Sequence, residues 1–184
     1  MNDESLRGRL LVSSPALRDP NFDRAIVLIL HHDEEGAVGV ILNRPSQLEV
    51  ADALPQWQHV ATTPAVLFIG GPVGPSSAIC LARMRTQQVD GWQAVFGGVG
   101  TFDLGRDPGD VADQLEGLRV FSGYSGWGPG QLEEELAVGA WMIVEPSPDD
   151  PLSADPEGLW RTVLRRQGGP LALLATFPSD PSLN

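Results

Sequence analysis

The chain has 184 residues and a formal net charge of −12, and 42% of its residues are hydrophobic. This length suits one domain covering residues 1–184, and so large an apolar fraction supplies a core, which argues against wholesale disorder. All 12 basic residues are arginines, which excludes chemistry that needs a lysine, such as a P-loop or a Schiff base. The acidic balance also opposes broad binding to nucleic acid or anionic membranes, because both require cations that neutralise phosphates.

Three features bear on the compartment. Cys80 is the only cysteine, so no internal disulfide can form, which favours a reducing environment. The first five residues are acidic and polar and lack the layout of a signal peptide. The longest clean apolar run, residues 25–30, is far shorter than the roughly 20 residues that span a bilayer. We therefore expect a cytoplasmic protein without membrane association.

In chain order, short apolar runs bounded by turn residues predict strands. The expected strands are 9–12, 25–30, 38–42, 66–69, 79–84 and a glycine-broken stretch at 92–102. The second and third form a hairpin with a loop longer than the tightest turn. Pro45 ends this hairpin because proline cannot donate to a strand ladder.

Helix signals come later in the chain. Asp107-Pro108 resembles an N-cap followed by proline at the first helical position and predicts a helix over 107–117. Similar signals predict helices over 128–139 and 155–168. Strands at 118–121 and 141–144 flank the second helix. Because helices and strands do not alternate regularly, the sequence predicts the α+β class.

Gly123–Trp127 lies between a predicted strand and a predicted helix, where a nucleophile elbow would place a catalytic serine. The elbow needs glycine two positions after Ser125, and Trp127 stands there. The residues therefore favour a tight glycine turn with an aromatic plug. A hydrolase that uses Ser125 or a carboxylate remains the alternative.

Metal and cofactor patterns are weak. His31 and His32 are neighbours on a strand and point to opposite faces, so they do not share one ion. Residues 97–100 lack the last glycine of a dinucleotide fingerprint. We therefore expect no metal and no cofactor. Glutamates 133–135 are predicted to form a solvated helix face near the positive end of the helix dipole.

Two turns are better candidates for binding an anion. Gly70-Gly71-Pro72 follows a strand, so its backbone N–H groups could approach an anion. Arg44 follows Asn43 at a strand end, where a guanidinium could hold a carboxylate or phosphate bidentately. Arg18, Arg24 and Arg44 bracket the predicted hairpin, and the simpler interpretation is a pair of ion bridges from them to Asp19, Asp23 or Asp33.

Three stretches resemble a known family. They are residues 8–45 (GRLLVSSPALRDPNFDRAIVLILHHDEEGAVGVILNRP), 68–73 (FIGGPV) and 119–136 (RVFSGYSGWGPGQLEEEL), the last followed by Trp141. They closely resemble the AlgH/YqgE family of bacterial proteins, in order and across nearly the whole chain. Several long motifs at the right spacing make the resemblance specific.

The resemblance implies a cytosolic protein with a bifurcated, mixed or antiparallel β-sheet, partly closed into a small barrel and surrounded by helices. It implies no catalytic residues. The family often has a Leu-His pair after the Gly-Gly-Pro turn, but here Leu81 is followed by Ala82, so no role for that histidine is expected. Carried over by motif, the candidate binding residues are Asn43, Arg44, Gly70, Gly71, Tyr124, Ser125, Trp127 and Gln131.

We therefore expect a non-enzymatic binding, adaptor or regulatory protein that captures a protein partner or a small anion. Some family members are labelled transcriptional regulators, which keeps a regulator as a further alternative. Direct DNA binding is not expected, because the chain is acidic and has no helix-turn-helix pattern. The turns at Asn43, Gly70 and Tyr124 would form one site if they converge in space.

Overall fold

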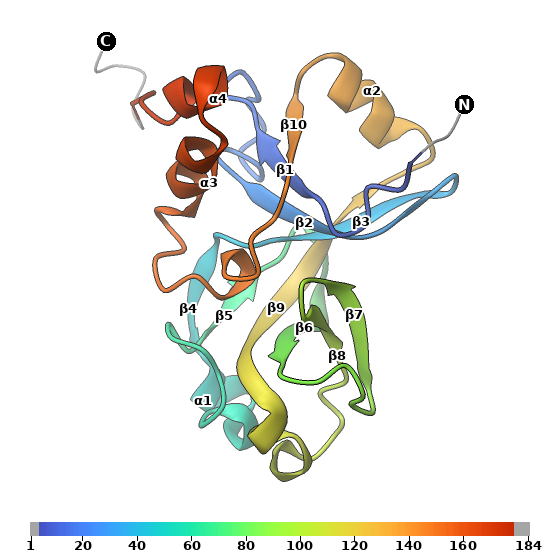
Figure 1. Ribbon diagram of the computed structural model, residues 1–184, viewed down its shortest axis with the longest axis vertical. Helices are drawn as coiled ribbons and strands as arrows, with labels where there is room; N and C mark the ends of the chain where they lie inside the picture. The colour runs from blue at the N-terminus through green and yellow to red at the C-terminus, as the bar shows by residue number, and fades with distance from the viewer. Residues whose placement is uncertain (1–3, 179–184) are drawn as a thin grey trace.

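Figure 1 shows the computed structural model of the protein, which describes residues 4–178. Within this range the chain forms a curled sheet in the order β10-β1-β2-β3-β9-β6-β8-β7, with β4 and β5 as a branch. The α+β class predicted from the sequence is confirmed. Nearly all pairs of strands are antiparallel, but β5 runs parallel to β9, so the sheet is mixed.

The elements have the following bounds. The strands are β1 (Leu10–Ser13), β2 (Ile26–Asp33), β3 (Gly36–Ile41), β4 (Pro45–Glu49), β5 (Val66–Ile69), β6 (Val73–Met84), β7 (Trp92–Phe96), β8 (Val99–Phe102), β9 (Leu115–Trp127) and β10 (Trp141–Val144). The helices are α1 (Val50–Ala53), α2 (Gln131–Ala137), α3 (Leu159–Gln167) and α4 (Gly169–Leu174).

The long strand β9 joins the two halves of the sheet. Its first part pairs with β6 on one side and with β5 on the other, where Phe121 lies opposite Phe68. Its last part pairs with β3, where Gly39 lies opposite Ser125. β3 and β5 therefore follow one another along the same edge of β9, and the sheet divides at their junction.

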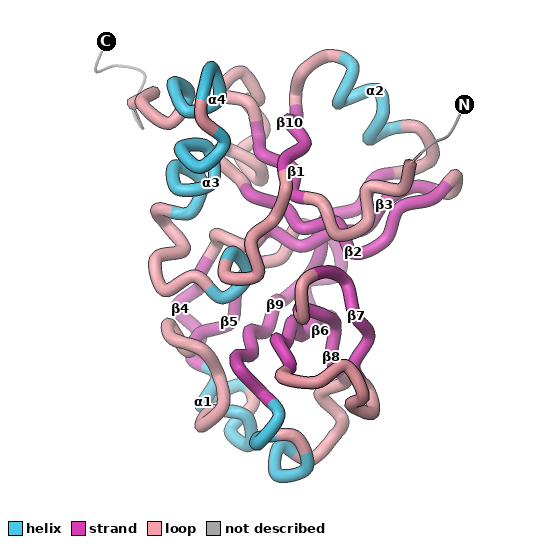
Figure 2. Tube along the Cα trace, in the orientation of Figure 1, coloured by secondary structure: helices cyan, strands magenta, loops and turns pink. Residues whose placement is uncertain are grey.

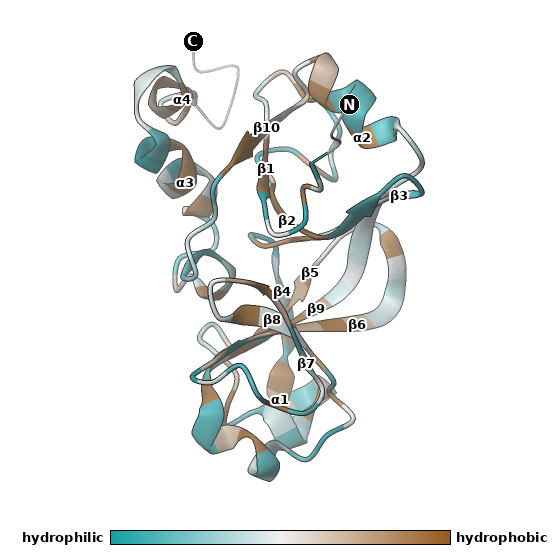
Figure 3. Cartoon of the chain, turned by 45° about the vertical axis from the view of Figure 1, so that its right-hand side comes forward, coloured by the Kyte–Doolittle hydropathy of each residue, from teal (hydrophilic) through white to brown (hydrophobic). Residues whose placement is uncertain are grey.

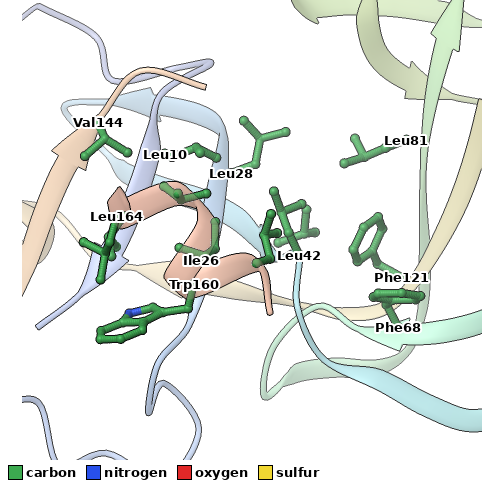
Figure 4. Packing of buried hydrophobic residues seen from close by; sticks show 14 of the residues in the cluster. Leu10, Ile26, Leu28, Leu42, Phe68, Leu81, Phe121, Val144, Trp160 and Leu164 are labelled. Carbon is green, nitrogen blue, oxygen red and sulfur yellow. The ribbon is translucent and has the colours of Figure 1, made fainter. Parts of the chain in front are cut away.

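The half of the sheet formed by β10, β1, β2 and β3, which we call the upper half, is buried on both faces. This burial explains the continuous apolar runs of β1 and β2. Leu10, Ile26 and Leu28 pack with α3, through Trp160 among others (Figure 4). The alternate residues of the same strands form a second cluster on the opposite face, which includes Leu132 of α2. Residues that alternate along a strand point to opposite faces, so one apolar run serves both clusters.

A third cluster fills the lower half, where β6, β7, β8 and β9 curl around Trp57 and Cys80. Figure 2 places α2, α3 and α4 around the upper half of the molecule, and α1 at its lower end. In Figure 3 the tip of the β2–β3 hairpin is hydrophilic, whereas β10 is hydrophobic. None of the helices within residues 4–178 is both long enough and apolar enough to cross a bilayer.

Several local predictions were wrong. Residues 107–117 do not form a helix: two 3-10 turns cover 108–110 and 112–114, and β9 begins at Leu115. The Asp107 side chain accepts a hydrogen bond from Gly109 N, so the predicted cap exists but serves a single turn. The β2–β3 loop is a two-residue turn, shorter than predicted. The hairpin does end before Pro45, since β3 ends at Ile41, but an unexpected strand, β4, begins at Pro45.

Candidate functional site

The segments around Asn43, Gly70 and Tyr124 do converge, at the junction where β3 and β5 meet along β9. The carbonyl of Gly70 accepts hydrogen bonds from Ile41 N at 2.8 Å and from the Ser125 hydroxyl at 3.1 Å. The amide of Ile69 donates to the carbonyl of Arg44 at 2.8 Å. Hydrogen bonds therefore link three segments that lie far apart in the sequence.

The side chains of Asn43 and Ser125 hold backbone groups in place at this junction. The Asn43 amide accepts a hydrogen bond from Ile26 N at 2.9 Å and donates to the Arg24 carbonyl at 2.8 Å, so both of its polar groups are engaged. Ser125 lies within β9, and no part of it is exposed. The predicted glycine turn at 123–127 is wrong: β9 continues through Ser125 to Trp127, so Ser125 does not lie at a strand-to-helix turn as in an elbow.

The glycines of the junction allow close approach of backbones. A Cβ at Gly70 would lie 2.4 Å from the carbonyl oxygen of Gly123, and one at Gly71 would lie 2.2 Å from the carbonyl of Tyr124. Such contacts are far inside van der Waals distance, so neither position accommodates a side chain. Tyr124 is half-buried opposite Val73 of β6 and packs against the upper core.

Trp127 and Gln131 belong to a separate network centred on Glu135. The Glu135 carboxylate accepts from the indole N–H of Trp127 at 2.9 Å, from that of Trp141 at 2.8 Å and from the Gln131 amide at 2.9 Å. The prediction that Glu135 lies on a solvated helix face was therefore wrong. These residues tie α2 to the sheet and do not border the junction.

Arg44 is the candidate residue that faces open space. It lines a hollow of about 420 Å³, which we call the arginine hollow. The lining residues are Pro20, Asp23, Arg24, Asn43, Arg44, Pro45, Glu157, Gly158, Trp160 and Arg161. The hollow thus collects three guanidinium groups and two carboxylates from the turn before β2, the start of β4 and the start of α3.

The contacts of the arginines give the hollow its shape. Arg24 has a φ of 51°, in the left-handed region that non-glycine residues rarely adopt, and its guanidinium lies 5.0 Å from the centre of the Trp160 ring. Arg24 and Arg161 both donate to the carbonyl of Phe177, at 3.1 Å and 3.2 Å. These two side chains therefore also hold the segment that follows α4.

Arg44 itself donates to the main-chain carbonyl of Asp23. No ion pair joins Arg44 to a carboxylate of residues 4–178, and Asp33 pairs with His31 instead, at 2.7 Å. The expected ion pair to Asp19, Asp23 or Asp33 is therefore not formed. Burial lowers the pKa of Arg44 below its usual range, and the nearby Asp23 carboxylate partly offsets this effect.

A second hollow, of about 190 Å³, is also lined by Arg44, and we call it the apolar hollow. It is lined by Pro20, Asn21, Ile41, Arg44, Ile69, Gly71 and Pro72. Ile69 is 49% exposed, which is high for a large aliphatic side chain. Arg44 and Pro20 line both hollows, so the two adjoin.

The histidines do not form a metal site. The Nδ1 of His32 accepts a hydrogen bond from Leu6 N at 3.0 Å, and its Nε2 lies 2.6 Å from a Glu133 carboxylate oxygen. Since Nδ1 accepts, the proton of the neutral ring is on Nε2 and points to Glu133. Within residues 4–178 no group of three or more His, Cys, Asp or Glu side chains is placed to hold a metal ion.

Two features of the structure have only weak signals in the sequence. Trp160, Arg161 and Glu157 were not singled out as site residues, because α3 is more than 100 positions from Arg44 in the chain. Arg119 was not noticed either, because a single arginine on a strand normally lies on the surface. Here only 2% of Arg119 is exposed, and burial lowers its pKa to about 10.

The fold and these contacts define a class: an α+β protein with a divided, curled sheet and arginine-lined hollows beside the division. The chain belongs to the AlgH-like family, whose model matches residues 10–172. It is 55% identical to a UPF0301 protein of Streptomyces avermitilis over 98% of this chain and 96% of that protein. A UPF0301 protein of Streptomyces coelicolor is 53% identical over the same shares.

Two solved structures are similar to this one. A crystal structure of a Corynebacterium diphtheriae protein has a TM-score of 0.89 and 31% identity, covering 96% of this chain and 94% of that chain. The solution structure of the AlgH protein from Pseudomonas aeruginosa has a TM-score of 0.70 and 27% identity, covering 98% of both chains. The family resemblance inferred from the sequence motifs is therefore confirmed.

Proposed function

We propose that this is a cytoplasmic, non-enzymatic protein that binds a small anion in the arginine hollow. The observation that carries the proposal is Arg44, whose guanidinium lines the hollow and forms no ion pair with a carboxylate of residues 4–178. A partly buried guanidinium without a paired carboxylate is a strong recognition element for anions, because it offers several N–H donors in a fixed plane.

The contacts at the junction favour binding over catalysis by Ser125. Its hydroxyl is fully buried and donates to Gly70 O. The imidazoles of His31 and His32 pair with Asp33 and Glu133, not with this serine. A serine nucleophile needs an adjacent base and an accessible oxygen, so the serine version of the hydrolase alternative lacks support.

A ligand screen by thermal shift and calorimetry tests the proposal, with phosphate, sulfate, acetate and larger carboxylates as probes. An anion at 100 times its dissociation constant adds about 2.7 kcal/mol to folding stability. For a chain of this size that corresponds to roughly 5–10 °C in Tm. The shift should vanish in Arg44→Gln and weaken in Arg44→Lys, which keeps the charge but loses the planar fork.

The matched control is Arg85→Gln, which makes the same charge change at an exposed residue outside both hollows. It should retain the full shift. The unliganded Tm of each variant is measured first, so that a loss of binding is separated from a loss of folding. If no anion stabilises the wild type, or if Arg44→Gln and Arg85→Gln lose the shift equally, the proposal is wrong.

The second candidate is an adaptor that binds a protein partner. It is favoured by the exposure of Ile69 and Val73, which are 49% and 40% exposed and lie on either side of the Gly70–Pro72 turn. A regulatory role would then act through that partner, since the net charge of −12 opposes direct contact with DNA. Duplex DNA that bound at low salt, with an affinity that falls as salt rises, would contradict this view.

A further inference from the structure

We infer that the ligand is a monocarboxylic acid with a short apolar arm: the carboxylate lies in the arginine hollow and the arm in the apolar hollow. This inference rests on the anion site proposed above and specifies its ligand. The geometry points to it because Arg44 and Pro20 line both hollows. A molecule held at Arg44 by its carboxylate can therefore reach the apolar hollow, which shares this lining.

The charges of the arginine hollow favour a monoanion. Arg44 carries one positive charge and forms no ion pair with a carboxylate of residues 4–178, and the lining also holds the carboxylates of Asp23 and Glu157. A phosphate dianion would place its second negative charge near these two carboxylates, whereas a carboxylate matches the single charge of Arg44. The planar fork of a guanidinium also fits the two oxygens of a carboxylate.

The lining of the second hollow favours an apolar arm. Ile41, Ile69, Pro72 and Pro20 supply most of its wall. About half of Ile69 is exposed to solvent, so an aliphatic group placed on it would remove apolar surface from water. The volume of this hollow, about 190 Å³, suits a short arm and not a long chain.

Other parts of the described chain offer weaker evidence for a ligand site. Cys80 is buried, the Glu135 carboxylate is satisfied by three donors, and Asp150 is held by both terminal nitrogens of Arg166 at 2.8 Å. The hollow around residues 105–109 is shallow and lined by one turn and Gln56. The two hollows at Arg44 are distinctive in joining a cationic wall to an apolar wall.

The test is calorimetric titration with acetate, butanoate, hexanoate and octanoate, together with hexanamide and inorganic phosphate. We expect affinity to rise about twofold to fourfold for each added methylene, for partial to full burial of that group. The rise should level off once the arm extends beyond the apolar hollow. Hexanamide should bind at least tenfold more weakly than hexanoate, because it lacks the charge that Arg44 recognises.

Two variants test the apolar hollow and Arg44 separately. Ile69→Ser should flatten the dependence on chain length and leave acetate binding unchanged, and Arg44→Gln should weaken every acid in the series. Leu48→Ser is the control for Ile69→Ser: Leu48 is 48% exposed and lines neither hollow. It should keep the full dependence on chain length.

The outcomes separate this inference from the proposal beneath it. If acids bind through Arg44 but longer arms add nothing, or if phosphate binds more tightly than hexanoate, the anion site stands and the apolar arm is wrong. If Ile69→Ser and Leu48→Ser behave alike, the arm does not lie in the apolar hollow. If no acid and no phosphate binds, both the inference and the proposed function fail.

Discussion

Arg119 gives the sharpest test of how this fold is held together. Arg119 lies on β9, and its guanidinium donates to the main-chain carbonyls of Pro151 at 3.1 Å, Ser153 at 2.9 Å and Thr63 at 2.9 Å. It also lies 4.3 Å from the centre of the Phe68 ring. One side chain therefore joins β9 to two loops that have no strand pairing with it.

The substitution Arg119→Met removes the charge while keeping a long, flexible side chain. Three hydrogen bonds to a charged group contribute roughly 1.5–3 kcal/mol each. Against this, burial lowers the pKa of Arg119 from 12.5 to about 10, which corresponds to a desolvation cost of about 3 kcal/mol. The difference leaves a net loss of about 1.5–6 kcal/mol in Arg119→Met.

The measurement is equilibrium unfolding in urea, with the midpoint and the slope determined for both proteins. We expect a lower midpoint at an unchanged slope and a Tm that falls by roughly 3–24 °C. Arg119→Lys should not restore stability, because an ammonium keeps the desolvation cost but cannot bridge the two loops.

One result would refute this reasoning. Apolar replacements of buried charged groups are neutral or stabilising in some proteins, because they remove the desolvation cost. If Arg119→Met is as stable as the wild type or more so, the three carbonyl bonds do not outweigh the burial of charge. A fully stable Arg119→Lys would show instead that charge alone suffices.

Three further predictions concern other groups. Glu135→Ala should lower the free energy of unfolding by about 2–4 kcal/mol, because two indole N–H groups lose their acceptor, whereas urea unfolding of the exposed Glu134→Ala should show a change within about 0.5 kcal/mol. Bonds from its own amide and from His32 hold the pKa of Glu133 below its ordinary 4.5. The stability this provides is present above about pH 4.5 and is lost as the pH falls through the lower folded pKa, so Glu133→Gln should flatten the acid limb of a stability–pH curve. Burial raises the pKa of the Cys80 thiol well above its ordinary range, so a thiol reagent at pH 8 should label Cys80 only after denaturant is added; rapid labelling of the folded protein would contradict this.

The strands were predictable because their apolar runs are buried on one or both faces, so the pattern records the environment directly. The helices α2 and α3 were also expected, each between a glycine-proline or aspartate-proline start and a glycine stop. Residues 107–117 were misassigned because Asp107-Pro108 stabilises the first turn of any helical segment, including a single 3-10 turn. What ends that segment at Leu115 is pairing with β6, a contact between distant parts of the chain.

The candidate site was predicted only in part, for a related reason. Arg44 could be identified because a charged residue at a strand end is a local feature. The role of Glu135 could not, because its two tryptophan donors come from β9 and β10 and meet only in the folded sheet. Trp160 likewise enters the arginine hollow from α3, and its distance from Arg44 in sequence carries no signal.

The motif residues differ in what their substitution can reveal. At Gly70 and Gly71 an added Cβ would collide with the backbone of β9, at 2.4 Å and 2.2 Å, and backbone atoms cannot move aside as a flexible side chain can. A loss of ligand binding in such variants would reflect a disrupted junction and would not identify the residues that contact the ligand. Ser125 and Asn43 have the same difficulty, since their side chains hold backbone groups of neighbouring segments. Arg44 is partly buried and holds one exposed carbonyl, so among these five residues its replacement separates ligand binding most cleanly from the integrity of the fold.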